Sequence, residues 1–89
     1  MSKLEHSNQF KRDIKKQPVE LFMSIEWTEV VQCLLTDTPM KSKYHDHDLK
    51  HNWKGSRECH IRPDLLLIYE RKSDHILLQR IGTHSELFG

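Results

Sequence analysis

Apolar side chains recur at helical spacing near the start of the chain. Phe10 and Ile14 stand four positions apart, Ser7 occupies an N-cap position before them, and Pro18 follows. This pattern predicts a short helix over Ser7–Lys16.

A second apolar stripe predicts a longer helix from about Val19 to Leu35. Its inward positions are Met23, Trp27, Val30, Val31 and Leu34. Trp27 and Cys33 are expected to be core residues, and Pro39 lies where the helix has ended. Residues 40–53 then form a long polar stretch, which is typical of a functional or mobile loop.

The pattern changes to strands from Ser56 onward. Turn signals at Arg62-Pro63 and at Lys72-Ser73-Asp74 divide this region into two antiparallel hairpins. The predicted strands are Ser56–Ile61, Asp64–Arg71 and His75–Ile81. Leu65–Tyr69 is apolar on both faces, which predicts the middle strand of the sheet.

Both ends of the chain add short elements. Lys3–His6 is predicted to form an edge strand, and Gly82 opens a segment, Thr83–Gly89, with the length of a last helical turn. The order β-α-α-β-β-β predicts an α+β fold with a mostly antiparallel sheet and two N-terminal helices on one face.

Composition limits the size and the cellular context of this fold. The chain has 89 residues, which predicts a single domain over 1–89. Cys33 and Cys59 have no C-x-x-C spacing, which argues against a disulfide framework and favours a reducing compartment. No apolar run approaches the ~20 residues of a membrane span, and the N-terminus resembles no signal peptide. We therefore expect a cytoplasmic protein without a membrane partner.

The charge is nearly balanced. A formal net charge of +1 argues against a protein that holds nucleic acid by gross positive charge, so an anionic partner must meet a local patch. The first predicted helix offers one, which we name the basic stripe: Lys11, Arg12, Lys15 and Lys16. Such a face is either solvated surface or a docking surface for phosphates.

Histidine is concentrated in the second half of the chain, which holds six of the seven. His45, His51 and His75 flank charged residues in loops and turns and are expected to be solvated. Three others, His47, His60 and His84, fall near the predicted sheet and are candidates for chemistry. Singly, each would more often be structural.

Strand alternation arranges several of these groups. Cys59 and His60 are expected on opposite faces, which makes them a poor candidate for a thiolate-imidazole pair, while Glu58 shares the face of His60. Asp64 follows Pro63 and is expected near His60. His84 lies just past the strand that carries Arg80.

Histidine, carboxylate, arginine and aromatic groups thus meet at the rim of one small sheet. They are the groups needed to cleave RNA without a metal: one accepts the proton of the 2′-hydroxyl, another protonates the leaving 5′-oxygen, and a cation stabilises the charge on phosphorus. Zinc is the alternative, since His45, His47, His51, Cys59, His60 and His84 include suitable ligands, although their spacing matches no known pattern.

Three blocks carry a family resemblance. They are Tyr44-His45-Asp46-His47-Asp48-Leu49, the run Asn52-Trp53-Lys54-Gly55-Ser56-Arg57-Glu58-Cys59-His60-Ile61-Arg62-Pro63-Asp64-Leu65-Leu66-Leu67-Ile68-Tyr69, and Arg80-Ile81-Gly82-Thr83-His84-Ser85-Glu86-Leu87-Phe88. In order and separation these blocks, about half the chain, resemble the YafQ branch of the RelE/ParE toxin superfamily.

The resemblance implies a RelE-like, microbial-RNase-like fold and a type II toxin neutralised by a cognate antitoxin protein. It further implies an endoribonuclease, an mRNA interferase, that cuts mRNA in the ribosomal A site, with ribosomal RNA and mRNA as partners and no cofactor. The active-site positions carried over are His47, His60, Asp64, Arg80, His84 and Phe88, with Trp53 and Arg57 as weaker members. Leu65 departs from relatives with tryptophan there, so codon preference could differ.

The individual roles combine both lines of reasoning. His84 is the expected general acid and Asp64 or His60 the base, although His84 and His60 could exchange roles. Arg80 is expected to stabilise the phosphorane, His47 to orient the phosphate, and Phe88 to stack on a base. The basic stripe would dock on ribosomal RNA.

Arg57 alternates away from His60, unless a bulge near Ser56 reconciles them. A ParE-like toxin that poisons gyrase and an inactive relative remain the alternatives.

Overall fold

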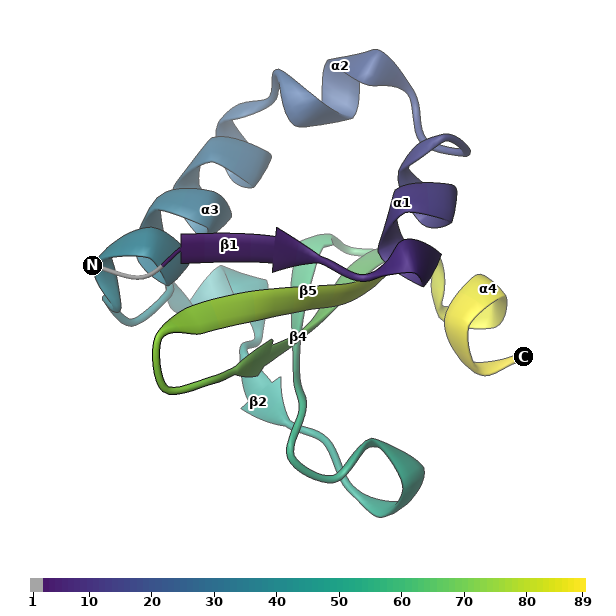
Figure 1. The fold of residues 1–89 in the computed structure, drawn as a ribbon. Helices are drawn as coiled ribbons and strands as arrows, with labels where there is room; N and C mark the ends of the chain where they lie inside the picture. Colours follow the sequence, from purple (N-terminus) through teal and green to yellow (C-terminus); the bar gives the residue numbers. More distant parts are fainter. Residues whose placement is uncertain (1–2) are drawn as a thin grey trace.

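A five-stranded mixed sheet forms the centre of the protein (Figure 1), whose computed structural model describes residues 3–89. The strands are β1 (Lys3–His6), β2 (His47–Asp48), β3 (Arg57–Arg62), β4 (Leu65–Arg71) and β5 (His75–Gly82). The helices are α1 (Asn8–Ile14), α2 (Val19–Phe22), α3 (Ile25–Thr36) and α4 (His84–Phe88), with 3-10 turns at Ser42–Tyr44 and His51–Trp53.

The strand order β1-β5-β4-β3-β2 confirms the α+β prediction and the central place of β4. β3, β4 and β5 are antiparallel, and β1 lies parallel to β5 at the edge. Leu65–Tyr69 is buried throughout, as expected for a strand covered on both sides. Among the helices of residues 3–89, none is long and apolar enough to cross a membrane.

The predicted helix Val19–Leu35 is wrong in one respect, because the chain breaks it at Met23–Ser24. The Ser24 side chain accepts a hydrogen bond from the Trp27 N–H (3.2 Å) and so starts α3 as a new helix. This break turns Met23 out of the apolar stripe, and its side chain is 79% exposed rather than buried. Val30 and Leu34 still reach the core as predicted.

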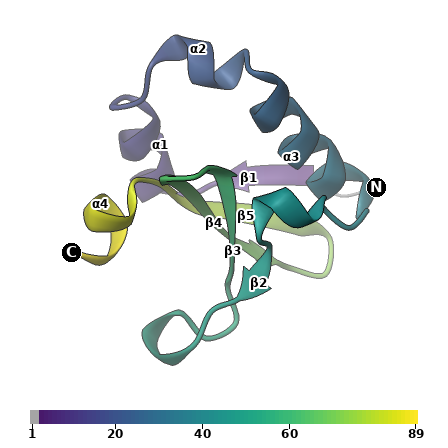
Figure 2. The same ribbon diagram turned by 180° about the vertical axis from the view of Figure 1, so that it is seen from behind.

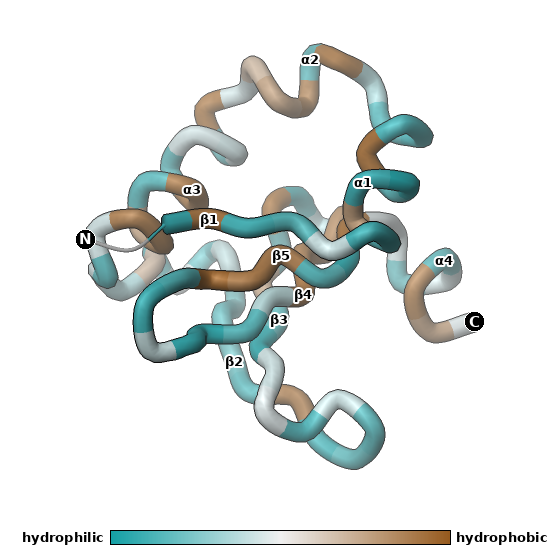
Figure 3. Tube along the Cα trace, in the orientation of Figure 1, coloured by the Kyte–Doolittle hydropathy of each residue, from teal (hydrophilic) through white to brown (hydrophobic). Residues whose placement is uncertain are grey.

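The two faces of the sheet are covered differently. α1, α2 and α3 arch over one face (Figures 1 and 2), where the larger core includes Phe10, Leu34 and Tyr69. The opposite face carries a smaller apolar cluster of Leu66, Ile68 and Leu87, against which Leu49 and Trp53 pack. Figure 3 shows the hydrophobic positions gathered along β4 and β5, between these two layers. We name the second side the open face.

Candidate active site

The strand register places a row of polar side chains on the open face. Residues directly opposite each other in antiparallel strands share a face, and His47 pairs with Glu58, Glu58 with Ile68, and Ile68 with Arg80. The polar side chains of this row therefore stand on β2, β3 and β5, and the buried apolar Ile68 of β4 lies between Glu58 and Arg80. Neighbouring strands lie about 4.8 Å apart, so the backbones of Glu58 and Arg80 are separated by about 10 Å.

A bulge brings Arg80 to this face. Tyr69 pairs with Leu78 but Ile68 pairs with Arg80, so Gln79 is the extra residue in β5. Without it, simple alternation would turn Arg80 toward the helices together with Leu78. Bulges commonly redirect a side chain beside a functional site in this way.

Glu58 is the centre of an imidazole cluster. Its side chain is 8% exposed, and its Oε1 lies 3.1 Å from Nε2 of His60 and 3.9 Å from Nε2 of His47. The other ring nitrogen of His47, Nδ1, lies 2.6 Å from the carbonyl oxygen of His45. The buried carboxylate thus holds His60 by a hydrogen bond and lies near His47, whose ring is oriented by its contact with the His45 carbonyl oxygen.

The loop that carries His47 is held in place by hydrogen bonds that Asp46 makes on the opposite side of the sheet. Asp46 accepts hydrogen bonds from the Tyr69 hydroxyl (2.5 Å) and from Nε of Arg57 (3.3 Å). Arg57 also bridges to Asp48 at 2.6 Å, and its hydrogen bond to Asp46 contributes most to raising its pKa. Because Asp46 points inward, its neighbours His45 and His47 are free to face the solvent.

Arg57 therefore does not join His60. The register between β3 and β4 is regular from Arg57 to His60 and shifts only between His60 and Arg62. The predicted alternation of Arg57 away from His60 is therefore confirmed, and no bulge between them changes it. The same alternation buries Cys59 on the helix side, and this burial raises the pKa of the thiol. A buried neutral thiol cannot serve as the nucleophile.

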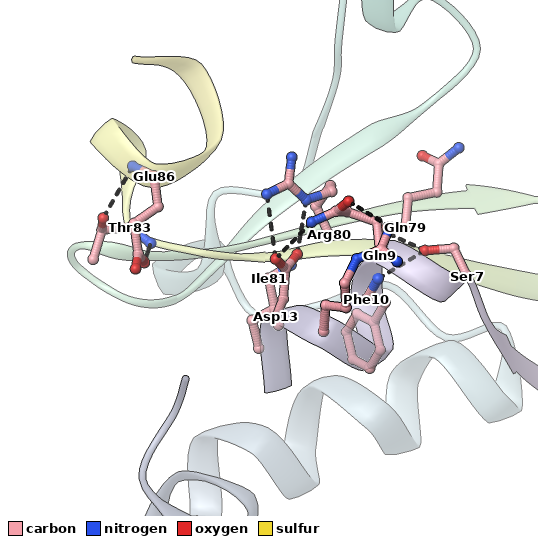
Figure 4. Close-up of polar contacts among 10 residues, drawn as sticks. Ser7, Gln9, Phe10, Asp13, Gln79, Arg80, Ile81, Thr83 and Glu86 are labelled. Carbon is pink, nitrogen blue, oxygen red and sulfur yellow. Dashed lines mark hydrogen bonds and ion pairs between the residues drawn. The ribbon is translucent and has the colours of Figure 1, made fainter. Parts of the chain in front are cut away.

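Arg80 is held by a carboxylate that the sequence reasoning missed. Asp13 of α1 is 3% exposed and accepts from Nε (2.7 Å) and Nη2 (3.2 Å) of Arg80 and from the Ile81 N–H (3.1 Å), as drawn in Figure 4. Burial alone would raise the pKa of Asp13, but the hydrogen bonds from Arg80 and Ile81 and the charge of Arg80 outweigh it and lower the pKa. The third guanidinium nitrogen points away from Asp13 (Figure 4).

The C-terminal helix presents the remaining candidates. Thr83 and Glu86 form a capping box that starts α4 (Figure 4). The ring of His84 lies 5.1 Å from that of Phe88, whose centroid is 6.4 Å from Trp53. Asp64 accepts from the backbone N–H of His84 at 3.4 Å. Asp64 is thus beside His84, whereas the carboxylate next to His60 is that of Glu58.

The structure therefore brings the predicted residues together in two groups on the open face. His47 and His60 surround Glu58, and Asp64, His84, Phe88 and Trp53 gather at α4, with Arg80 reaching the same face from β5. All four residues of the basic stripe are exposed, as predicted.

Three residues near the site were not predicted, although each had a signal in the sequence. Glu58 shares the face of His60 by alternation, and Asp13 stands three positions after Phe10 on the inner side of α1. His45 is exposed, as predicted, but its ring also packs against His60 at 5.5 Å. From the sequence we considered His45 as a solvated loop residue and as one candidate zinc ligand, but not as a neighbour of His60.

The imidazole cluster has the ligand types that a transition metal would use. Even so, no group of three or more histidine, cysteine, aspartate or glutamate side chains within residues 3–89 is arranged to hold a metal ion. His47, Glu58 and His60 would have to move to coordinate one.

This chain is similar to known proteins over nearly its whole length. Residues 2–89 match the family described as bacterial toxin of type II toxin-antitoxin system, YafQ. The chain is 34% identical to the mRNA interferase toxin YafQ of Escherichia coli (strain B / BL21-DE3), with 97% of this chain and 95% of that protein covered.

Solved structures of bacterial toxins are similar to this chain in fold and in sequence. YafQ in the E. coli DinJ-YafQ complex superposes with a TM-score of 0.81 at 32% identity, covering 100% of both chains. A copper-bound mutant toxin from Helicobacter pylori gives a TM-score of 0.89 at 41% identity, covering 99% of this chain and 100% of that one.

Fold, site and comparisons together define a small toxin of a bacterial type II toxin-antitoxin system. Within that class, the chain belongs to the YafQ family. Family membership confirms the resemblance seen in the sequence and favours the ribonuclease prediction over the gyrase alternative, since the E. coli relative is named an mRNA interferase.

Proposed function

We propose that this chain acts as an mRNA interferase: a single-domain, ribosome-dependent endoribonuclease of the bacterial cytoplasm that cuts mRNA in the ribosomal A site. The observation that carries the proposal is the row of acid, imidazole and guanidinium groups on a sheet face that α1, α2 and α3 leave uncovered. A single RNA strand can reach the exposed side chain of His47 and the partly exposed side chains of His60 and Arg80 on this face.

The proton transfers are assigned to the imidazoles and Asp64. His84 protonates the leaving 5′-oxygen, and Asp64 or His60 accepts the proton of the attacking 2′-hydroxyl. The contact between Asp64 and the His84 backbone supports a shared location for acid and base, while Glu58 orients His60 for the alternative assignment. Histidine suits both roles because the ordinary imidazole pKa lies near neutrality.

Stabilisation of the negative charge on the phosphate is assigned to Arg80 and His47. Asp13 engages two nitrogens of Arg80, so the guanidinium is fixed while its third nitrogen stays available to a phosphate oxygen. His47 contacts the same phosphate from β2. Phe88 and Trp53 offer aromatic faces on which a base can stack.

No step in this scheme requires a metal ion, since each proton and each charge has a side chain assigned to it. The copper-bound H. pylori toxin bears on this point, because a metal held by His47 and His60 would compete with their roles toward RNA. Measuring cleavage after dialysis against a chelator separates the two cases.

Two macromolecular partners complete the proposal. A net charge of +1 gives little affinity for free RNA, so the ribosome delivers the mRNA and the basic stripe docks on ribosomal RNA. A cognate antitoxin protein neutralises the toxin, by analogy with the DinJ-YafQ complex of E. coli.

The test compares one mRNA in two states, naked and bound to a ribosome with a vacant A site. We expect rapid cleavage only on the ribosome, giving a 5′-hydroxyl end and a 2′,3′-cyclic phosphate or 3′-phosphate. The same transcript without a ribosome-binding site is the matched control. Equal cleavage of both states would remove the ribosome from the mechanism, and 5′-phosphate ends would mean that water was the nucleophile.

A further inference from the structure

A cavity of about 660 Å³ opens beside the two imidazoles of β2 and β3. Its volume falls in the range of about 300–1,000 Å³ that is usual for ligand sites. His47 and His60 form one wall, so the cavity is continuous with the proposed catalytic groups. It lies where β3 continues beyond its pairing with β2, which engages Arg57 and Glu58.

The opposite walls combine flat surfaces with charge. His45 and Pro63 supply the flat surfaces, and Lys43 and Arg62 supply two cations. Glu26 is the carboxylate of the lining, and its Oε1 lies 3.6 Å from Nε of Arg62. The lining thus offers stacking faces, phosphate ligands and one hydrogen-bond acceptor.

The flat wall is held in place by the backbone. His45 adopts a left-handed conformation (φ 48°) and closes the 3-10 turn with a hydrogen bond from its N–H to the Ser42 carbonyl oxygen (3.0 Å). The preceding residue, Tyr44, is buried and donates its hydroxyl hydrogen to Glu29 of α3. Such anchoring prepares the His45 ring for stacking before a ligand arrives.

We propose that this cavity binds one nucleotide of the mRNA next to the scissile phosphodiester. The base stacks on His45, Lys43 and Arg62 contact the nucleotide's phosphate, and Glu26 accepts a hydrogen bond from an exocyclic amino group of the base. Single-stranded RNA is commonly recognised by splayed bases that stack on aromatic rings and use their polar edges. The inference rests on the proposed function, since it assigns a neighbouring position of the same substrate.

Glu26 gives the site a chemical preference. Adenine, cytosine and guanine carry an exocyclic amino group that can donate to a carboxylate, whereas the only base donor of uracil, N3–H, is flanked by two carbonyl oxygens that a carboxylate repels. The cavity therefore favours the amino-bearing bases at this position. An acidic peptide is the less suitable occupant, because Glu26 would repel its carboxylates and it would leave the His45 face without a planar partner.

The binding test uses an RNA trinucleotide with 2′-deoxyribose at the cleaved position, so that cleavage cannot occur. Isotope-labelled protein is titrated with it and followed by NMR. We expect the signals of Lys43, His45 and Arg62 to move together with those of His60. His45→Ala should weaken binding about tenfold, as expected for the loss of one base stack, while His75→Ala, remote from the cavity, leaves it unchanged.

Base preference provides the second measurement. Glu26→Gln should reduce the preference for cytosine over uracil in otherwise identical trinucleotides, with folding checked from the amide spectrum of each variant. If the RNA moves the signals of His47 and His60 but not those of Lys43, His45 and Arg62, the inference is overturned. Protection of these three residues by the antitoxin but not by RNA would overturn it as well.

The two proposals can fail separately. RNA binding in the cavity without cleavage on the ribosome would contradict the proposed function and support this site. Cleavage on the ribosome, together with RNA that moves the signals of His47 and His60 but not those of Lys43, His45 and Arg62, would support the proposed function and contradict this site.

Discussion

Asp13→Asn is the most informative perturbation, because it removes one charge from a buried pair and changes little else. The amide has the shape of the carboxylate and can still accept from the Ile81 N–H. It cannot neutralise Arg80, whose Nε and Nη2 now bond to Asp13 at 2.7 and 3.2 Å. The variant therefore leaves a cation in a partly buried position without its counter-ion.

The cost follows from the burial of the two partners. Removing one member of a buried ion pair destabilises a protein by about 3–5 kcal/mol. The Asp13 side chain is 3% exposed, but that of Arg80 keeps 21% of its surface in water. We therefore expect the lower end, about 3 kcal/mol. For a domain of this size, that loss lowers Tm by about 12 °C or more.

The pH dependence has a definite sign. Because folding lowers the pKa of Asp13, its stabilisation is fully present above the unfolded pKa of about 3.9 and is lost as pH falls through the folded pKa. The difference in unfolding free energy between wild type and Asp13→Asn should be largest near neutrality and shrink below about pH 4.

Urea unfolding at several pH values measures this difference. Asp37→Asn is the matched control, since Asp37 bridges to Arg71 at 2.8 Å with both side chains exposed, and such pairs contribute about 0–1 kcal/mol. A loss below about 1 kcal/mol for Asp13→Asn, or a difference that does not change with pH, would refute the reasoning.

Three further predictions concern activity. The His84→Gln variant cannot donate a proton from a cationic ring, so its single-turnover cleavage on the ribosome should slow by about 10²- to 10⁴-fold with little change in binding. His75→Gln, at the far end of β5, is the control. Equal cleavage rates for His84→Gln and the wild type would assign the general acid to another residue. Neutralising the basic stripe should weaken co-sedimentation with ribosomes and its salt dependence while the fold persists, and unchanged co-sedimentation would make the stripe ordinary solvated surface. Dialysis against a chelator should leave the cleavage rate intact, whereas a loss that zinc or copper restores would contradict the metal-free scheme.

The helices and strands that were predicted correctly are those whose patterns lie within a short stretch of the sequence. The three long strands follow from alternation and from the turn at Pro63, and α1 follows from the N-cap Ser7, whose side chain accepts from the Phe10 N–H (2.9 Å). The break at Ser24 was missed because Met23 and Trp27 continue a four-residue spacing across it. An N-cap inside an apolar stripe leaves the spacing unchanged, so periodicity alone does not reveal it.

The sequence predicted which residues belong to the candidate site better than it predicted which residues contact them. His47, His60 and Arg80 share a face, yet Arg80 reaches it through a bulge at Gln79 that alternation does not anticipate. The partnership of Asp13 with Arg80 spans 67 positions. Pairings of that separation depend on the packed fold. Glu58 lies only two positions from His60 and shares its face by alternation, but we weighed only Asp64 as the carboxylate near His60.

The pairing of the first strand with the last has a consequence for the synthesis of the protein. β1 lies against β5, and Ser7 bonds to the Gln79 carbonyl oxygen across 72 positions of the chain. Contacts of this separation form only after the intervening chain has closed into a loop. A nascent chain without β5 has no edge for β1, no Arg80 for Asp13 and no α4. The proposed site, which includes Arg80 and His84, is therefore assembled only after β5 and α4 have been synthesised and β1 and α1 have packed against β5.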